Sequence, residues 1–417
     1  MKDASKHPLL DMFPELLNGV EYVKLDEMGS FYSGLSGKSK EDFRDGNAKF
    51  ITYVNIFNNP ALKTDVEDKV KIADGEKQNT IQYGDLLFTG SSETPDECGM
   101  CSVLTHHTDE NLYLNSFCFG FRFNDLSDKC PSFMKHLFRS TSIRKKICKT
   151  ANGVTRYNIS KKEFAKLEIP LPPLPVQEAI VNILDRFAVY AAELQAELQA
   201  RQQQYNYYRD TLLSFEGRDD VQWKKLGEVC AKTDNIKWKT TTGTYQYIDL
   251  SSVDIQTHSI LSTTPIDKSS APSRAQQIVR ENDVIFATTR PTQMRVCIVP
   301  SKYDGEICST GFCVLRPNKE IVLPQYLFFA LAVDDFRAYL SNNLTQGNYP
   351  SISNNTLKEY LLPIPSIEEQ QHIVDILDRF DHLTNDLSQG LPAEIEARQQ
   401  QYEYYRDKLL TFKRKGE

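Results

Sequence analysis

The sequence predicts an α+β protein with two globular domains of mixed sheet and helices, separated by two long helices that form an antiparallel coiled coil. Three observations support this prediction. Long strings recur at two places in the chain, each recurring string carries a heptad pattern of apolar residues, and short β-rich runs fill the segments between them. Together they describe a pseudo-twofold internal repeat.

The internal repeat is clearest in two pairs of strings. The string "IPLPPLPVQEAIVNILDRF" (169–187) matches "LPIPSIEEQQHIVDILDRF" (362–380), and "ARQQQYNYYRDTLLSF" (200–215) matches "ARQQQYEYYRDKLLTF" (397–412). Internal repeats decide architecture before any local feature does. The repeat therefore predicts globular segments at 1–166 and 218–360 and helical segments at 167–217 and 361–417.

The globular segments echo each other more weakly, in the same order along the chain. "GDLLFTGSS" (84–92) parallels "NDVIFATTR" (282–290), and both are β-rich runs that end in turn residues. Segments 130–147 and 324–343 have helical spacing. Diverged domains beside nearly constant helices suggest variable recognition on a fixed frame.

The first long helix carries an apolar seam from Ile180 to Phe215 in alternating steps of four and three residues. Only Arg201 is polar among the seam positions. This spacing is typical of a coiled coil. A helix of about 40 residues is roughly 60 Å long. The helix is expected to begin near Pro175, after the prolines that end the preceding strand.

The second long helix has the same seam with a four-residue irregularity between Leu387 and Ile395. Gly390 and Pro392 lie at this point, which predicts a break or kink. At its start, Ser366 and Glu369 have the spacing of a capping box.

An apolar seam needs a partner in water, and antiparallel pairing of the two helices within the chain is the simplest arrangement. Packing of each helix on a globular domain or on another subunit is the alternative. The strings "YNYYRD" and "YEYYRD" contain more tyrosines than the seam requires, and such aromatic clusters are typical of protein interfaces. The predicted subunit-interface residues are Tyr205, Tyr208, Arg209, Tyr402, Tyr405 and Arg406.

Composition excludes some classes of protein. The net charge is −7. The acidity lies in the helical segments, since 167–217 has three Lys and Arg against seven Asp and Glu, and 361–417 has seven against eleven. The globular segments are nearly neutral, so nucleic acid remains a possible partner. No membrane span or signal peptide is recognisable, and the nine irregularly spaced cysteines are typical of reduced thiols in a cytoplasmic protein.

Catalytic motifs are missing from the sequence. It contains neither a GxxxxGK[ST] loop nor a GxGxxG loop after a strand. Cys98 and Cys101 with His106 and His107 resemble a metal-binding box, but the second ligand pair that zinc usually requires is absent. We therefore expect a non-catalytic protein without a metal or cofactor of its own.

The duplicated pattern resembles the specificity (S) subunit of type I restriction–modification enzymes. The strings that carry the likeness are "EIPLPPLPVQEAIVNILDRF", "ARQQQYNYYRD", "LLPIPSIEEQQHIVDILDRF" and, most specifically, "GLPAEIEARQQQYEYYRDKLLTF". The resemblance implies that 1–166 and 218–360 are target recognition domains and that 167–217 and 361–417 are helical spacers.

The resemblance also implies a division of labour. Each recognition domain would bind one half of a bipartite target in double-stranded DNA. Two modification (methyltransferase) subunits that bind S-adenosylmethionine would dock on the helices. Restriction subunits, which are translocases and nucleases that use ATP and Mg, would join them. All of these cofactors would lie on the partner subunits.

Two loops recur in both halves and are the candidate DNA-binding sites, because DNA sequence is read mainly by such polar side chains. Ordinary surface loops are the alternative. One loop follows a buried strand and the other precedes the "NIS" or "SIS" turn. The candidates are Thr89, Ser91, Ser92, Thr155, Arg156, Tyr157 and Asn158 in the first half, and Thr288, Thr289, Arg290, Gln293, Thr345, Gln346, Asn348 and Tyr349 in the second. "RKKICK" (144–149), Lys237 and Lys239 are candidate phosphate contacts.

The string "AELQAELQA" (192–200) is a tandem four-residue repeat inside the first long helix. One such unit adds about 6 Å and about 40° beyond a full turn, which nearly preserves the helix face. We expect it to set the spacing between the two half-sites. Two other functions remain open from sequence: a scaffold that joins two protein-binding domains without DNA, and an enzyme with unrecognised chemistry.

Overall fold

The computed structural model describes residues 6–345, 347, 349–385 and 389–416, and it divides the chain into two compact units. Unit 1 comprises Met1–Ala192 with Ala397–Glu417, and unit 2 is Glu193–Glu396. Each unit therefore holds one globular domain together with parts of both long helical segments.

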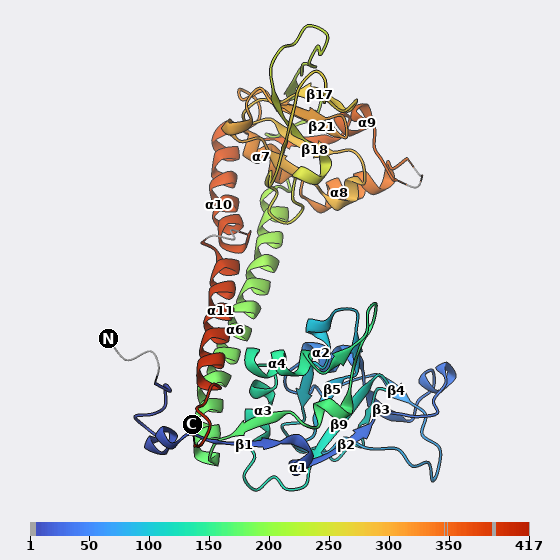
Figure 1. The fold of residues 1–417 in the computed structure, drawn as a ribbon. Helices are drawn as coiled ribbons and strands as arrows, with labels where there is room; N and C mark the ends of the chain where they lie inside the picture. The colour runs from blue at the N-terminus through green and yellow to red at the C-terminus, as the bar shows by residue number, and fades with distance from the viewer. Residues whose placement is uncertain (1–5, 346, 348, 386–388, 417) are drawn as a thin grey trace. The chain divides into compact units, whose positions relative to one another are not determined.

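Unit 1 is built around a four-stranded antiparallel sheet with the order β2-β9-β5-β7. A smaller sheet (β4-β3-β8) lies beside it, and two ribbons, β1-β12 and β10-β11-β6, complete the domain (Figure 1). The strands are β1 (Glu21–Lys24), β2 (Gly29–Ser33), β3 (Ala48–Ile51), β4 (Lys69–Val70), β5 (Leu86–Thr89), β6 (Ser91–Ser92), β7 (Cys101–Val103), β8 (Tyr113–Leu114), β9 (Cys118–Phe123), β10 (Ala151–Asn152), β11 (Tyr157–Ile159) and β12 (Glu168–Leu171). The short helices are α1 (Leu25–Met28), α2 (Tyr53–Asn58), α3 (Pro131–Leu137), α4 (Thr141–Cys148) and α5 (Lys161–Phe164).

Unit 2 repeats this plan with the sheets β14-β21-β18-β19 and β16-β15-β20-β17 and the ribbon β13-β22. Its strands are β13 (Gln222–Lys225), β14 (Cys230–Ala231), β15 (Tyr245–Ile248), β16 (Thr264–Ile266), β17 (Ala275–Ile278), β18 (Val284–Ala287), β19 (Val296–Ile298), β20 (Ile307–Ser309), β21 (Phe312–Pro317) and β22 (Leu361–Ile364). Its short helices are α7 (Pro324–Ala330), α8 (Asp334–Asn342) and α9 (Asn354–Lys358). The α+β class and the internal repeat are therefore confirmed.

The helical segments predicted within the domains each form two helices. Segment 130–147 divides into α3 and α4, and segment 324–343 divides into α7 and α8. The division occurs because Ser140 and Val333, which precede the second helices, have extended backbone (ψ 149° and 158°). In each unit the apolar faces of these helices pack on the main sheet, where Phe88 and Phe286 are fully buried.

The first long helix is continuous, and the second is interrupted. α6 runs from Leu174 to Leu212, whereas α10 (Ile367–Asn385) and α11 (Leu391–Leu409) divide the second helical segment. The predicted break is confirmed, although Gly390 directly precedes α11, where its carbonyl accepts a hydrogen bond from the Glu394 amide (3.2 Å). Leu387 of the predicted seam lies outside the described residues.

Parts of the two helical segments pack antiparallel within each unit. In unit 1, α6 and α11 lie side by side (Figure 1), and Phe187 of α6 stacks on Tyr405 of α11 at 5.5 Å. In unit 2, Tyr208 of α6 stacks on Phe380 of α10 at 5.4 Å. At the start of α10, Ser366 accepts the Glu369 amide, but the Glu369 carboxylate binds Arg218 instead of completing the predicted capping box.

The N-terminal and C-terminal segments meet in unit 1. The Val20 amide donates to the Lys413 carbonyl and the Lys415 amide donates to the Val20 carbonyl, both at 2.9 Å. Leu213 and Phe215 are buried in the core of unit 2 at the matching place, where the chain continues directly from α6 into β13. A non-covalent junction in one unit thus corresponds to a peptide connection in the other.

Candidate nucleic-acid interface

The structure brings the two candidate loops of unit 1 together. β6 and β11 pair antiparallel, so that Ser91 faces Asn158 and Ser92 faces Tyr157. The Tyr53 hydroxyl donates to the Ser91 carbonyl at 2.8 Å and ties the pair to α2. The loop that precedes β11, including Thr155 and Arg156, is exposed.

The equivalent loops of unit 2 also meet. Ser351 forms antiparallel bridges with both Thr289 and Thr345. The Arg290 amide donates to the Pro350 carbonyl at 2.7 Å, and the Ile352 amide donates to the Thr288 carbonyl at 2.9 Å. In both halves, therefore, the turn after the central strand lies against the segment that precedes the "NIS" or "SIS" turn.

Three of the candidate side chains are buried and support these loops from within. The Thr89 hydroxyl accepts the Met100 amide (2.9 Å), the Ser91 hydroxyl accepts Arg156 (3.0 Å), and the Thr288 hydroxyl donates to the Gly311 carbonyl (2.9 Å). The exposed fractions of the three residues are 0%, 6% and 8%, respectively. Their contribution is to the shape of the loop.

The remaining described candidates are more accessible. Ser92, Tyr157 and Thr289 are half-buried. The exposed candidates are Thr155, Arg156, Asn158, Arg290, Gln293, Thr345 and Tyr349. Gln346 and Asn348 lie outside the described residues.

Each loop pair carries an arginine against an aromatic ring. The Arg156 guanidinium lies 5.6 Å from the centre of the Phe117 ring, and the Arg290 guanidinium lies 4.9 Å from the centre of the Tyr349 ring. Phe117 was not a candidate from sequence, because it follows β8 far from either loop string, yet it is 59% exposed. Arg290 has a left-handed backbone (φ 51°), which turns its side chain sharply out of the strand direction.

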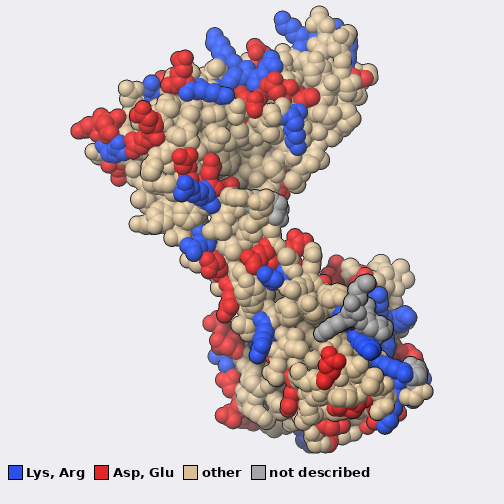
Figure 2. Space-filling view, turned by 90° about the vertical axis from the view of Figure 1, so that its left-hand side faces the viewer, with Lys and Arg blue, Asp and Glu red and all other residues tan. Residues whose placement is uncertain are grey.

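The lysine-rich candidates differ in availability. Within 144–149, Lys145 and Lys149 are exposed, whereas Arg144 donates to the Cys98 carbonyl (2.7 Å) and Lys146 donates to the Glu168 carbonyl (3.0 Å). Lys237 and Lys239 are exposed in unit 2. Figure 2 shows basic and acidic side chains interspersed over the face in view.

A buried ion pair supports the central strand of each domain. Arg122 donates to both carboxylate oxygens of Asp85 (2.9 and 2.6 Å), and Arg316 binds Asp283 in the same way (3.0 and 2.9 Å). Both aspartates are 1% exposed. In unit 1 the Tyr32 hydroxyl also donates to Asp85 at 2.7 Å, and burial together with that carboxylate raises the pKa of Tyr32.

A buried glutamine in the first turn of α6, and another in the first turn of α10, fastens the globular domain to the helix. Gln177 accepts the Cys130 amide (2.9 Å) and donates to the carbonyls of Asp128 and Pro172 (2.8 Å each). Gln370 makes the matching three bonds in unit 2, accepting the Leu323 amide at 2.9 Å. Both side chains are fully buried. The glutamines stand in the repeated strings "PVQEA" and "IEEQQ", but their role required the structure.

Unit 1 has a further polar link that unit 2 lacks. His136 of α3 contacts the Asp185 carboxylate (2.7 Å) through Nε2 and the Tyr402 hydroxyl (3.0 Å) through Nδ1. Burial lowers the pKa of His136 despite the Asp185 carboxylate, so the ring is neutral, with Nε2 donating and Nδ1 accepting. Phe329 occupies the equivalent place in α7 and is 2% exposed.

The predicted docking aromatics are only partly available. Tyr205 and Tyr402 are half-buried, Arg209 is 6% exposed, and the Arg406 side chain is 12% exposed. Tyr208 and Tyr405 are 38% and 37% exposed and stack within their own units. Their neighbours Tyr207 and Tyr404, which were not predicted, are the most exposed tyrosines of these strings at 68% and 59%.

The cysteine and histidine box of unit 1 is dispersed into the fold. Cys101 is fully buried, and burial raises the pKa of its thiol to about 12. All nine cysteines are unpaired. Within the described ranges, no cluster of three or more His, Cys, Asp or Glu side chains has a geometry for metal binding. Among the helices described, none combines the length and the apolar character needed to cross a membrane.

Comparison with known proteins gives the family. The model of the type I restriction modification DNA specificity domain matches the chain twice, over residues 18–201 and 218–397. The specificity subunit of the type I restriction enzyme EcoR124I/EcoR124II of Escherichia coli is 34% identical over 275 residues, which cover 61% of this chain and 65% of that protein. The chain thus spans just under two thirds of that relative.

Solved structures share the fold. The S subunit of the type I restriction-modification system from M. genitalium covers 94% of this chain and 97% of its own, at 16% identity and a TM-score of 0.50. A chain from a structure of complex assembly and conformational transition of the type I R-M system has the same coverage and identity and a TM-score of 0.63. With both domain matches in place, the chain belongs to the type I restriction modification DNA specificity domain family.

Proposed function

We propose that this chain is the DNA sequence-specificity subunit of a type I restriction–modification complex and has no catalytic activity of its own. Each globular domain binds one half of a bipartite target in double-stranded DNA. The observation that carries this proposal is the recurrence, in both halves, of two adjoining loops that bear an exposed arginine against an aromatic ring. Arginine is the side chain most often used to read guanine in the major groove.

Within each loop pair, the exposed polar side chains are assigned to base and backbone contacts. Arg156 and Asn158 carry this role in unit 1, and Arg290, Gln293 and Thr345 carry it in unit 2. The buried hydroxyls of Thr89, Ser91 and Thr288 hold the loops in shape. Lys145, Lys149, Lys237 and Lys239 are exposed cations that neutralise phosphates, which adds affinity without sequence information.

Two modification subunits dock at the tyrosine-rich helix ends. Equivalent residues recur there: Tyr207 with Asp210, Thr211 and Ser214 line one hollow, and Tyr404 with Asp407, Lys408 and Thr411 line another. A surface that occurs twice in one chain suits two copies of one partner. S-adenosylmethionine, ATP and Mg belong to the modification and restriction subunits, and the complex acts in the cytoplasm.

The test is to co-express the chain with modification subunits and to map methylated positions in genomic DNA by sequencing. The expected result is a single bipartite motif whose two parts are separated by a fixed number of unspecified bases. A continuous motif, or methylation by the isolated chain, contradicts the proposal. Mixed subunits that lack this chain provide the control and should methylate no specific site.

A further inference from the structure

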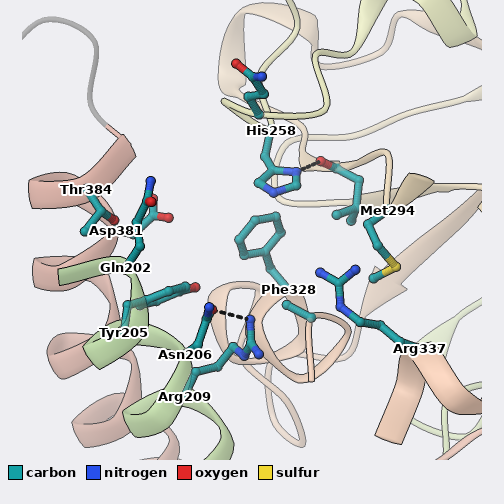
Figure 3. Close-up of a pocket in the computed structure, with 13 residues that line it drawn as sticks. Gln202, Tyr205, Asn206, Arg209, His258, Met294, Phe328, Arg337, Asp381 and Thr384 are labelled. Carbon is teal, nitrogen blue, oxygen red and sulfur yellow. Dashed lines mark hydrogen bonds between the residues drawn. The ribbon is translucent and has the colours of Figure 1, made fainter. Parts of the chain in front are cut away.

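Unit 2 contains a cavity of about 270 Å³ with polar and apolar walls between the main sheet, α6 and α10. Its walls include Tyr205 and Arg209 of α6, Asp381 of α10, and His258, Phe328 and Arg337 of the domain (Figure 3). The charged and polar side chains in its walls favour filling by water or by a ligand over an empty cavity. The chemistry of its walls indicates which ligand.

Ala332, in the wall of the cavity, is the equivalent of a half-buried arginine of unit 1. Arg139 follows α3 and donates to the carbonyls of Cys101 (2.7 Å), Ile56 (2.8 Å) and Phe57 (2.9 Å). Counted from the first proline of α3 and of α7, the equivalent residue in unit 2 is Ala332, which lines the cavity. The Val296 carbonyl, which corresponds to the Cys101 carbonyl in the strand pairing, accepts His258 instead (3.2 Å). A small residue and a histidine therefore replace the arginine of unit 1 at this wall of the cavity.

A second arginine has also changed its role between the units. Arg144 of α4 donates to the carbonyls of Gly99 (2.5 Å) and Cys98 (2.7 Å). Its equivalent in α8 is Arg337, whose guanidinium lies 3.9 Å from the Asp334 carboxylate, beyond hydrogen-bonding distance. Figure 3 shows Arg337 and Arg209 extending toward the same space from different elements. Arg337 thus retains donors that a ligand can use.

Arg209 makes the cavity a built site. It is 6% exposed, and its guanidinium binds Asp210 (2.9 Å) and Asn206 (3.2 Å). A guanidinium has five N–H donors in a planar fork, so donors remain after these bonds. Two guanidinium groups in the walls of one small cavity supply the kind of donors that bind a phosphate group.

The other walls limit the size and charge of the ligand. His258 donates through Nδ1 to the Val296 carbonyl (3.2 Å) and meets Phe328 edge to face at 5.4 Å, so these rings close one side. Asp381 lies on the opposite wall and disfavours a highly charged anion. An anion that keeps an O–H group, such as hydrogen phosphate or a phosphomonoester, can donate to such a carboxylate.

We propose that this cavity binds a phosphate group through Arg209 and Arg337, and that only unit 2 has the site because Ala332 replaces the arginine of unit 1. The inference goes beyond the proposed function, since it concerns a cavity between the domain and its helices and not the loop pair. The phosphate comes either from a free phosphate compound or from the backbone of a nucleic acid.

The test is calorimetric titration of the full-length chain with inorganic phosphate. Wild type should bind one equivalent. Arg337→Gln should weaken binding at least tenfold, and Ala332→Arg, which restores the residue of unit 1, should abolish it. Arg280→Gln is the matched control, because Arg280 is exposed in the same domain and pairs with Asp304 at its surface; its affinity should equal that of wild type.

Duplex DNA distinguishes the two sources of phosphate. If a backbone phosphate is the occupant, inorganic phosphate should compete with duplex binding to wild type and not to Arg337→Gln. If a free phosphate compound is the occupant, phosphate and duplex should bind together. No saturable binding by wild type, or wild-type affinity in both Arg337→Gln and Ala332→Arg, overturns the proposal. Because Arg337 is exposed, its variant separates lost binding from failed folding.

Discussion

Units 1 and 2 have nearly the same helix sequences and the same order of strands in the main sheet, but they fasten the domain to the helix in different ways. Both use a fully buried glutamine, Gln177 or Gln370, with the same three hydrogen bonds. Beyond that clamp, unit 1 relies on the hydrogen-bonded His136 and on Arg139, whereas unit 2 has Phe329 and Ala332 at these positions.

The difference shows which parts of a duplicated protein diverge together. The helix side of each junction is nearly constant, since Asp185 and Asp378, and likewise Tyr402 and Tyr205, are equivalent. The domain side has changed, and the loss of His136 and its neighbouring Lys135 leaves Asp378 without an equivalent partner. Partial burial and the nearby Asp381 and Asp375 raise the pKa of Asp378, whereas hydrogen bonds from His136 and Lys135 outweigh burial and lower the pKa of Asp185.

The largest loss of stability should come from the pair of aspartate and arginine that both units contain. Asp85→Ala and Asp283→Ala each remove a buried carboxylate that accepts a partly exposed arginine and a backbone amide, which costs about 1–3 kcal/mol for each group left unsatisfied. Asp85→Ala should be the worse of the two because Tyr32 also loses its acceptor. Urea unfolding combined with hydrogen exchange of each unit measures both. An effect below about 1 kcal/mol in either variant would contradict an essential ion pair; Asp304→Ala, at an exposed pair, is the control.

The junctions between domain and helix should lose different amounts of stability when the side chain at their equivalent position is truncated. Phe329→Ala should cost about 3–5 kcal/mol through cavity formation, and His136→Ala should cost about 1–3 kcal/mol by leaving buried polar groups unpaired. Hydrogen exchange of α7 and α3 reports the two losses separately. Equal effects would mean that the chemistry of the junction does not matter.

The unit 1 junction should depend on pH through His136. Because the folded pKa of His136 lies below its ordinary value of 6.5, the folded state binds fewer protons between these two values. The free energy of unfolding therefore falls as pH falls from 6.5 through the folded pKa, by about 1.4 kcal/mol per unit of pKa difference. His136→Phe should flatten this slope, although the lowered pKa values of His7 and His258 remain. An unchanged slope would assign it to those two residues.

Substitutions in the loops should each reduce specificity at one half-site only. Arg156→Ala should lower specificity for one half of the target and Arg290→Ala for the other, each by about 1–3 kcal/mol at a single base-pair position. Methylation mapping with reconstituted complexes detects the relaxed position, and Arg280→Ala is the control. Loss at both half-sites in either variant would contradict independent domains. Asn348→Ala tests the same loop of unit 2.

The helix ends should act as two equivalent docking sites. Tyr207→Ala and Tyr404→Ala should each weaken one modification-subunit site by about 1–2 kcal/mol, since exposed tyrosines are frequent energetic centres of interfaces. The number and affinity of bound subunits can be measured by analytical ultracentrifugation. Leu261→Ala, another exposed apolar residue (67%), should have no effect.

The smallest energetic effect should come from the tandem repeat. Deletion of Ala196–Gln199 removes about 6 Å of α6 and rotates the C-terminal part of the helix by about 40°. The seam keeps nearly the same face, so stability should change little. The spacer in the methylated motif should shorten by at most one to two base pairs at about 3.4 Å each, with both half-sites unchanged. An altered half-site, or an unchanged spacer in an active complex, would show that the tandem repeat does not set the spacing between the half-sites.

The sequence alone was enough to predict the repeated architecture, the continuous first helix and the break near Gly390. Each of these rests on local periodicity or on strings long enough to match. It also located the loops around Arg156 and Arg290, because one precedes the repeated "NIS" or "SIS" turn and the other follows the repeated β-rich run. The sequence alone also placed Thr89, Ser91 and Thr288 among the residues that contact DNA. These residues are buried, and the sequence after a strand does not show which neighbours cover a polar side chain.

Tertiary structure decided what depends on residues far apart in the chain. The pairing of β6 with β11, the ring of Phe117 beneath Arg156 and the bonds of Gln177 join positions tens of residues apart, and no periodicity encodes such contacts. The cavity beside Ala332 is the clearest case. A single small residue in a helical string carries no signal, and its role emerges only when the cavity beside it is compared with the hydrogen bonds of Arg139 at the equivalent position of unit 1.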